Sequence, residues 1–300
     1  MNAKRPLVMA GAPVIQKKAL RVLMAAGGTG GHIFPALAVA QELRARWQTA
    51  ESSREAFGAC RIEFAGTGRG LEARVIPAAG FPLHQLAAAG LKGIGGFRKL
   101  RNFLVLPRSF WDTARLLYRL RPDVVVGAGG YVAGPVMLAA ALAGIPTLLI
   151  EPNAAPGFTN RALAPFVRLA ALGFEEAAPV YGKKARVTGH PVRSAFNRIG
   201  AKQIASPVVI LILGGSQGSL AINNAVIGAL PLFAKRTDEF RMVHQAGERW
   251  HERVRQAYVG TGLNAEVHAF IDDIPRALEQ ADLVICRSGA STVAELAAAG

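Results

Sequence analysis

Short apolar runs that end in glycine recur along this chain, and each is followed by a stretch with helical character. Examples are LRVLMAA before GGTGGH, CRIEFAG before TGRG, and PDVVVGAGG before YVAGPVMLAAALAG. Continuous apolar runs rich in β-branched residues are typical of strands buried on both faces of a parallel sheet. The pattern therefore predicts an α/β fold with parallel sheets covered by helices.

The same plan starts again in the second half of the chain, where VVILILGGSQGSLAINNAVIGALPLF repeats the order of strand, glycine pair, hydroxyl residue, further glycine and helix. A chain of 300 residues is long enough for two such domains. We predict a flexible N-terminal extension over residues 1–19, a first domain over 20–193 and a second domain over 194–300. Because ligands bind beyond the carboxyl ends of parallel strands, the active site is expected in a cleft between the domains.

One uncharged run, VAGPVMLAAALAGIPTLLI over residues 132–150, is long enough to suggest a membrane span. Gly144 and Pro146 interrupt this run, so we predict a buried helix followed by a parallel strand, and no transmembrane helix. The two cysteines, Cys60 and Cys286, have no spacing typical of a disulfide framework or a zinc site, which fits a reducing cytoplasm.

Positive charge dominates the chain, with 35 Lys and Arg against 20 Asp and Glu, and residues 1–160 carry 19 of these basic residues against 8 acids. The densest stretch, residues 92–121, holds eight basic residues and one acid, interleaved with bulky side chains such as Phe103, Phe110 and Trp111. This mixture suits a surface that rests on anionic lipid headgroups rather than on nucleic acid. It suits equally well a helix that packs on the core and keeps a solvated basic face.

Two glycine loops, residues 27–31 and 214–218, lead from a strand into a helix, where backbone amides can approach a phosphate group. A dinucleotide site is disfavoured, because Ile33 stands where the fingerprint needs glycine, and neither loop carries the Gly-Lys-Ser/Thr of a nucleotide triphosphatase. The chain also lacks an Asp-x-Asp or His-Glu-x-x-His motif, so no metal is expected in the active site. His32 closes the first loop and is a candidate proton acceptor, or alternatively a helix cap.

The chain carries seven motifs in the order GGTGGHIFPALAVA, GAGGY, EPN, GHPVR, GGSQGS, FIDD and CRSGASTVAEL. In their order and spacing they resemble those of the transferases that form lipid II, which belong to glycosyltransferase family 28, and the resemblance covers about residues 20–300. The resemblance implies a GT-B fold and inverting transfer of N-acetylglucosamine from UDP-N-acetylglucosamine to the 4-hydroxyl of the muramyl sugar on lipid I, an undecaprenyl-linked acceptor. It also implies no cofactor, a peripheral location on the cytoplasmic face of the bacterial inner membrane, and anionic lipids and other cell-wall synthesis proteins as partners.

The same resemblance assigns roles to individual residues, and His32 matches the candidate general base. The donor-binding positions are Thr29, Gly30, Gly31, Asn153, Arg193, Gly215, Ser216, Gln217, Gly218, Ile271, Arg287, Ser288, Gly289, Ala290 and Glu295. The acceptor-binding positions are Gly27, Gly28, Gly129, Gly130 and Tyr131. The donor is expected mainly on the second domain and the lipid acceptor on the first.

Three of the donor residues have specific implied roles. Glu295 matches the carboxylate that accepts hydrogen bonds from both ribose hydroxyls, although the spacing from Thr292 also predicts a helix capping box. Ile271 matches the residue beside uracil, and Arg193 would be a cationic clamp for the departing diphosphate.

The chain departs from the family pattern in three places. Pro152 replaces a common glutamine, His190 replaces a common asparagine, and the family continues beyond Gly300 with a glutamine-bearing segment and a final helix. The second domain is therefore expected to be incomplete at its C-terminus. Two alternatives stay open: another GT-B enzyme, such as a glycolipid synthase or a UDP-sugar 2-epimerase, and a truncated form that binds UDP without turnover.

Overall fold

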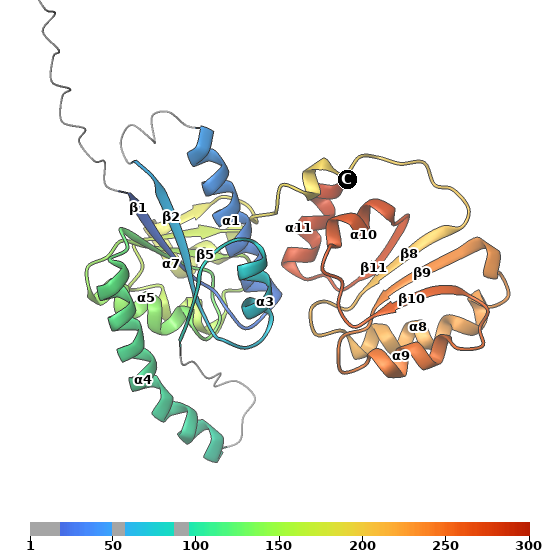
Figure 1. Ribbon diagram of the computed structural model, residues 1–300, viewed down its shortest axis with the longest axis horizontal. Coiled ribbons are helices and arrows are strands. Elements are labelled where there is room, and N and C mark those ends of the chain that lie inside the picture. The colour runs from blue at the N-terminus through green and yellow to red at the C-terminus, as the bar shows by residue number, and fades with distance from the viewer. Residues whose placement is uncertain (1–18, 50–57, 87–95) are drawn as a thin grey trace, which may run out of the picture.

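The structure is a computed structural model that describes residues 19–49, 58–86 and 96–300 (Figure 1). Its first described sheet is parallel and has the strand order β3-β2-β1-β4-β5-β6-β7. The strands are β1 (Leu20–Ala25), β2 (Cys60–Gly66), β3 (Leu83–Gln85), β4 (Val124–Gly127), β5 (Thr147–Glu151), β6 (Leu169–Leu172) and β7 (Ala185–Val187).

Helices cover both faces of this sheet, as the continuous apolar strands require. They are α1 (Gly30–Thr49), α3 (Leu71–Ala78), α4 (Gly96–Leu120), α5 (Ala133–Leu142), α6 (Phe158–Leu163) and α7 (Ala178–Tyr181). Strand β1 alternates between two apolar clusters: Val22 and Met24 pack with α1 and α3 on one face, whereas Leu23 and Ala25 pack with α5 on the other. The strand is buried on both faces for this reason.

The second sheet is also parallel and has the order β10-β9-β8-β11. Its strands are β8 (Val208–Leu213), β9 (Phe240–Gln245), β10 (Asn264–His268) and β11 (Leu283–Cys286), and its helices are α8 (Leu220–Phe233), α9 (His251–Tyr258), α10 (Ile274–Gln280) and α11 (Ala290–Ala299). Helices α8 and α9 cover one face, and α10 and α11 cover the other (Figure 1).

The segment between β7 and β8 joins the two sheets and contains a short 3-10 helix, Phe196–Arg198. Phe196 is fully buried and packs with α10 and α11. Helices α1 and α3 lie on the side of the first domain that faces α11 (Figure 1), and α1 contacts α11 directly. The predicted boundary between residues 193 and 194 falls within this segment and stays a prediction.

The prediction of two parallel α/β domains is confirmed, and so is the division of residues 132–150 into helix α5 and strand β5. Among the described residues, no helix combines the length and the hydropathy that crossing a bilayer requires. The predicted extension over residues 1–19 lies almost wholly outside the described residues, and so does the part of the basic stretch over residues 92–95.

The described part of the basic stretch combines the two alternatives left open by the sequence. Near the C-terminal end of α4, Leu116 and Leu117 are buried in the core against α5. Trp111, Arg115 and Tyr118, which follow each other at helical spacing, are exposed. The helix therefore packs on the core with one face and presents aromatic and basic side chains on the other.

Candidate active site at two switch points

The strand order creates one topological switch point in each sheet. In the first sheet it lies between β1 and β4, whose carboxyl ends lead into residues 26–29 and 128–132. In the second sheet it lies between β8 and β11, whose carboxyl ends lead into residues 214–219 and 287–289. Ligands of open α/β sheets bind at such points, and most of the predicted site residues fall on these four loops.

Close backbone contact joins the two loops of the first switch point. Gly130 has a φ of +86°, and a Cβ there would collide with the carbonyl oxygen of Gly27. The ring of Tyr131 lies over Gly28, 3.2 Å from where a Cβ would be. Gly27, Gly28, Gly129, Gly130 and Tyr131, the five predicted acceptor residues, therefore lie together.

His32 lies in the first turn of α1, which begins at Gly30 and Gly31 directly after Thr29. Its Nδ1 is 3.2 Å from Thr29 Oγ1, so when Nδ1 donates to this hydroxyl, Nε2 is left as an acceptor. A Cβ on Gly129 would lie 3.1 Å from Nε2, so this glycine leaves room beside the imidazole. Burial lowers the pKa of His32 and the charge of Glu151 opposes this shift, so the ring is neutral near pH 7 and able to accept a proton.

Glu151, at the carboxyl end of β5, is a fully buried carboxylate beside this site. Its Oε1 accepts hydrogen bonds from the backbone and side-chain nitrogens of Asn153, at 2.9 and 3.0 Å, and its Oε2 accepts one from Asn160 Nδ2 at 2.9 Å. The side-chain oxygen of Asn160 is buried without a hydrogen-bond partner, and a Cβ on Gly129 would lie 3.2 Å from it. A polar cluster therefore links the predicted donor residue Asn153 to the surroundings of His32.

A second buried carboxylate, Glu72 of α3, lies behind the first glycine loop. It accepts a hydrogen bond from the Gly28 amide at 3.4 Å and another from the Thr67 hydroxyl. Glu72 thus holds the loop to α3, and an anion at this loop would share the Gly28 amide with a carboxylate.

The second switch point assembles the loop that carries Gly215, Ser216, Gln217 and Gly218. Gly218 has a φ of +75°, and a Cβ there would collide with the carbonyl oxygen of Ala246, so this loop packs directly on the end of β9. The guanidinium of Arg287 lies over Gly215. Ser219 begins α8 by accepting a hydrogen bond from the Ile222 amide, which leaves the helix N-terminus facing the loop. Ser288, Gly289 and Ala290 follow Arg287 at the start of α11.

Arg193 connects the two domains. Its guanidinium lies 4.7 Å from the ring of Phe34 in α1 and 4.9 Å from that of Phe196, and its Nη2 is 3.5 Å from Glu295 Oε1 in α11. Burial raises the pKa of Glu295 and the charge of Arg193 opposes this shift. The predicted clamp and the predicted ribose carboxylate therefore lie together, close to the helix that carries His32.

The alternative reading of Glu295 as part of a capping box is wrong. Helix α11 begins at Ala290, and its N-cap residue is Gly289, which has no side chain to accept a hydrogen bond. Thr292 therefore lies inside the helix, where it cannot act as the cap. Nearby, Ser291 Oγ and His190 Nε2 are 3.2 Å apart, so the histidine that replaces the family's asparagine still makes a polar contact to α11.

A second bridge between the domains brackets Ile271. Arg74 of α3 pairs with Asp272 at 3.2 Å, and its guanidinium lies 4.6 Å from the ring of Phe270. The Ile271 amide donates to Gln245 Oε1 at 2.9 Å. The segment predicted to lie beside uracil is thus held by side chains of both domains.

Four buried polar residues near these strand ends were not predicted from the sequence: Glu72 of α3, Glu151 at the end of β5, Asn160 of α6 and Gln245 at the end of β9. Glu151 and Gln245 are the last residues of buried strands, in TLLIE and FRMVHQ, and a polar residue at that position is a usable signal. Among the described residues, no group of three or more His, Cys, Asp and Glu side chains is placed to hold a metal ion.

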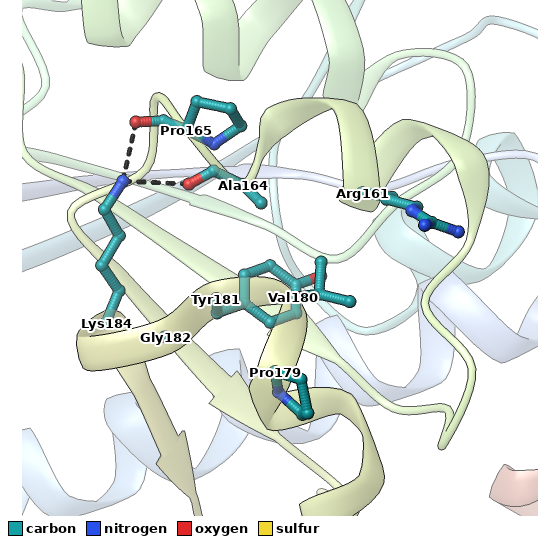
Figure 2. A pocket seen from close by; sticks show the side chains of 8 residues that line it. All are labelled: Arg161, Ala164, Pro165, Pro179, Val180, Tyr181, Gly182 and Lys184. Atoms are coloured by element: carbon teal, nitrogen blue, oxygen red, sulfur yellow. Dashed lines mark hydrogen bonds between the residues drawn. The ribbon is translucent and has the colours of Figure 1, made fainter.

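Figure 2 shows a pocket of about 720 Å³ that none of the predicted site residues lines. Arg161 of α6 and Tyr181 of α7 lie on its walls, and Lys184 donates to the carbonyl oxygens of Ala164 and Pro165 at 3.0 and 2.7 Å. Burial and the charge of Glu151 raise the pKa of Tyr181. The pocket thus lies behind the polar cluster, and its lysine is already engaged.

Both domains of the chain match models of one protein family. Residues 22–171 match the glycosyltransferase family 28 N-terminal domain, and residues 209–300 match the glycosyltransferase family 28 C-terminal domain. A Myxococcus xanthus (strain DK1622) protein is 42% identical over 280 residues, 92% of this chain and 70% of that protein. An Anaeromyxobacter sp. (strain Fw109-5) protein is 44% identical over 92% of this chain and 71% of its own length.

Both relatives are named UDP-N-acetylglucosamine–N-acetylmuramyl-(pentapeptide) pyrophosphoryl-undecaprenol N-acetylglucosamine transferase. Among solved structures, the crystal structure of Acinetobacter baumannii MurG matches with a TM-score of 0.63 and 34% identity, over 93% of this chain and 76% of that one. The two domain matches together cover well over half of the chain, so the chain belongs to glycosyltransferase family 28.

Proposed function

We propose that this protein transfers N-acetylglucosamine from UDP-N-acetylglucosamine to the 4-hydroxyl of the muramyl sugar of lipid I, which gives lipid II for peptidoglycan synthesis. One observation carries the proposal: Arg193 bridges the two switch points. It contacts Phe34, on the helix whose first turn carries the neutral, half-buried His32, and it pairs with Glu295 of the second domain. The names of the relatives in the same family agree with this chemistry.

The proposed reaction is a single displacement at the anomeric carbon of the donor sugar. The acceptor oxygen forms a bond to that carbon, while the bond between the carbon and the β-phosphate oxygen of UDP breaks. His32 takes the proton of the attacking hydroxyl, and the bonding electrons leave with UDP. Attack from the face opposite the leaving group inverts the configuration and gives a β-1,4 linkage.

Departing UDP carries additional negative charge, which must be stabilised as the bond breaks. The amides of residues 215–218, the N-terminus of α8 and the Arg193 guanidinium supply positive potential for this purpose. No metal ion takes part in this proposal, because the sequence has no Asp-x-Asp motif to bind one with the donor diphosphate. Transfer that persists in excess EDTA would support this, and loss of transfer that Mg²⁺ restores would contradict it.

Substrate positions follow from the same arrangement. Glu295 would accept hydrogen bonds from the ribose hydroxyls, Ile271 would lie beside uracil, and Asn153 would face the donor sugar. The acceptor diphosphate would lie along Gly129 and Gly130, where Glu72 does not occupy the amides.

We also propose that the first domain rests on the cytoplasmic face of the inner membrane, where its lipid-linked acceptor is found. The support comes from large exposed apolar side chains on this domain, namely Trp111 and Tyr118 of α4, Leu142 of α5 and Phe158 of α6. Basic residues such as Arg115 lie between them, and this combination favours anionic lipid headgroups.

The purified chain is tested with labelled UDP-N-acetylglucosamine and a lipid I analogue. Transfer of label to the muramyl sugar supports the proposal. Transfer only to a different lipid would indicate a glycolipid synthase, and conversion of the free UDP-sugar without any lipid would indicate an epimerase. Binding of UDP with no turnover in any of these assays would favour the form that binds nucleotide without catalysis.

A further inference from the structure

Gln245 is a buried polar residue for which the proposed reaction has no use. It is the last residue of β9, which runs between β8 and β10 in the second sheet. Its exposed fraction is 3%, so its carboxamide must find its hydrogen-bond partners within the protein.

The two ends of this carboxamide bind two different segments of the proposed donor site. Nε2 donates to the carbonyl oxygen of Gly215 at 2.9 Å, and Oε1 accepts from the Ile271 amide at 2.9 Å. Only one orientation of the amide satisfies both partners, because a carbonyl needs a donor and an amide needs an acceptor. Gln245 therefore bridges the glycine loop after β8 and the segment after β10.

Backbone contacts show that this bridge has little freedom to adjust. Gly247 follows β9 with a φ of +88°, and a Cβ there would collide with the carbonyl oxygen of Gln217. The Asn223 side chain of α8 donates to the carbonyl oxygen of Ala246 at 2.9 Å. The backbone at the end of β9 thus packs directly against the glycine loop, and the side chain of Gln245 bonds to the Ile271 amide of the neighbouring segment.

We infer that Gln245 is a positioning residue that sets the separation between two walls of the donor pocket. The diphosphate wall consists of residues 215–218, and the base wall is the segment at Ile271. This inference rests on the proposed function, in which residues 215–218 face the diphosphate of UDP and Ile271 lies beside its uracil. Gln245 touches neither ligand group itself. It acts through the carbonyl of Gly215 and the amide of Ile271.

A bridge of this kind has a specific consequence for ligand binding. A ligand that touches only one wall binds equally well whether or not the walls are held at a fixed separation. A nucleoside diphosphate touches both walls and pays the entropy of ordering them when the bridge is missing. Loss of Gln245 should therefore weaken UDP far more than it weakens uridine or inorganic pyrophosphate.

The test uses Gln245→Met, which keeps the length of the side chain and removes both hydrogen bonds. UDP, uridine and pyrophosphate are titrated separately into wild type and variant, and the melting temperature of each protein is recorded. We expect the affinity for UDP to fall about tenfold, and the affinities for uridine and pyrophosphate to change less than about twofold. Gln256→Met on the exposed side of α9 is the matched control and should leave all three affinities unchanged.

A second variant, Gln245→Glu, keeps the acceptor for Ile271 and loses the donor for Gly215. It should also lose UDP affinity while keeping uridine affinity, and it decides the question if the Met variant fails to fold. Unchanged UDP affinity in a folded variant, or an equal fall for all three ligands, would overturn the inference. Wild-type protein that bound no UDP at all would instead overturn the proposed function, and the inference with it.

Discussion

At the scale of single residues, a general base is effective only while it is unprotonated. Two influences act on the pKa of His32, which decides its protonation state. Burial lowers its pKa, whereas the negative charge of Glu151 raises it. Catalytic bases work best when their pKa lies close to the working pH, since a much weaker base accepts protons poorly. The carboxylate therefore limits how far burial can weaken the imidazole.

His32→Ala tests the assignment of the base. Turnover should fall about 10²–10⁴-fold, which is the usual contribution of a general base, because His32 is the proton acceptor in the proposed reaction. The dissociation constant for UDP should stay nearly unchanged, since the proposed diphosphate site lies on the second domain. His251→Ala is the matched control, because this histidine lies on α9 of the second domain, where its Nε2 is bonded to the Val267 carbonyl oxygen at 3.0 Å. Normal turnover in His32→Ala would show that another group accepts the proton.

Glu151→Gln tests the electrostatic part of the same idea. Removing the negative charge removes the influence that raises the pKa of His32, so this pKa should fall further below its ordinary value. The acid limb of the profile of kcat/KM against pH should then move to lower pH. Glu63→Gln, which changes a carboxylate of β2 that pairs with His84, should leave the limb in place. A shift to higher pH would contradict the assigned coupling.

At the scale of elements, the site depends on loops that approach each other too closely for side chains. Gly130→Ala should destabilise the protein by more than about 3 kcal/mol, because the positive φ and the collision with the Gly27 carbonyl both oppose the methyl group. Gly144 after α5 has a φ of +72° with nothing near a Cβ, so Gly144→Ala should cost only about 1 kcal/mol. Urea unfolding compares the two variants, and equal losses would contradict the close approach.

A buried network holds β9 to the helices beside it and makes this unit sensitive to acid. His244 Nε2 donates to Asn223 Oδ1 at 3.1 Å, its Nδ1 lies 3.2 Å from the Tyr258 hydroxyl, and burial lowers its pKa from 6.5 to about 4. The unfolded chain therefore binds a proton that the folded chain excludes between these pH values. The contribution of His244 to the free energy of unfolding is fully present above pH 6.5. It is lost progressively, by about 3 kcal/mol in total, as the pH falls from 6.5 through 4.

His244→Gln tests this network, since glutamine can donate and accept without titrating. The variant should lose less stability than wild type when urea unfolding is repeated at steps from pH 7 to pH 4. Other groups titrate in both proteins, so the difference between the two curves is the relevant measurement. Parallel curves would show that His244 is not the acid-sensitive group.

The sequence predicted the elements and their loops well, because buried strands and glycine turns are local patterns. The strands that begin at Leu20 and Val208 were predicted from such runs, and the structure confirms them. The partners of Gln245 could not be predicted, because they depend on which strands are neighbours in the sheet. Those of Glu151 and Asn160 lie close in sequence but depend on the path of the irregular segment between β5 and α6. The predicted capping box was wrong for a different reason. The helix begins at Ala290, before Thr292, and the local pattern does not define a helix boundary to within a few residues.

At the scale of the whole molecule, charge and exposed aromatic side chains are distributed unequally between the two domains. The chain carries a net charge of +15, and most of the excess lies within residues 1–160. The exposed aromatic side chains Trp111, Tyr118 and Phe158 lie on the same domain, with exposed fractions of 65%, 77% and 86%. In the proposed orientation a membrane would therefore be met by the first domain, and the proposed UDP-sugar side of the second domain would stay open to the cytoplasm.

Vesicle sedimentation tests this orientation. The protein should bind vesicles that contain phosphatidylglycerol more strongly than vesicles of phosphatidylcholine, and added salt should weaken the binding, because each basic residue near an anionic surface contributes about 1 kcal/mol and is screened. Trp111→Ser and Tyr118→Ser should each reduce the bound fraction, since their apolar rings would enter the headgroup region. Leu232→Ser, which changes an exposed apolar residue of α8 in the second domain, is the matched control and should bind like wild type. If Leu232→Ser reduced binding as much as Trp111→Ser, the membrane would not be met by the first domain alone.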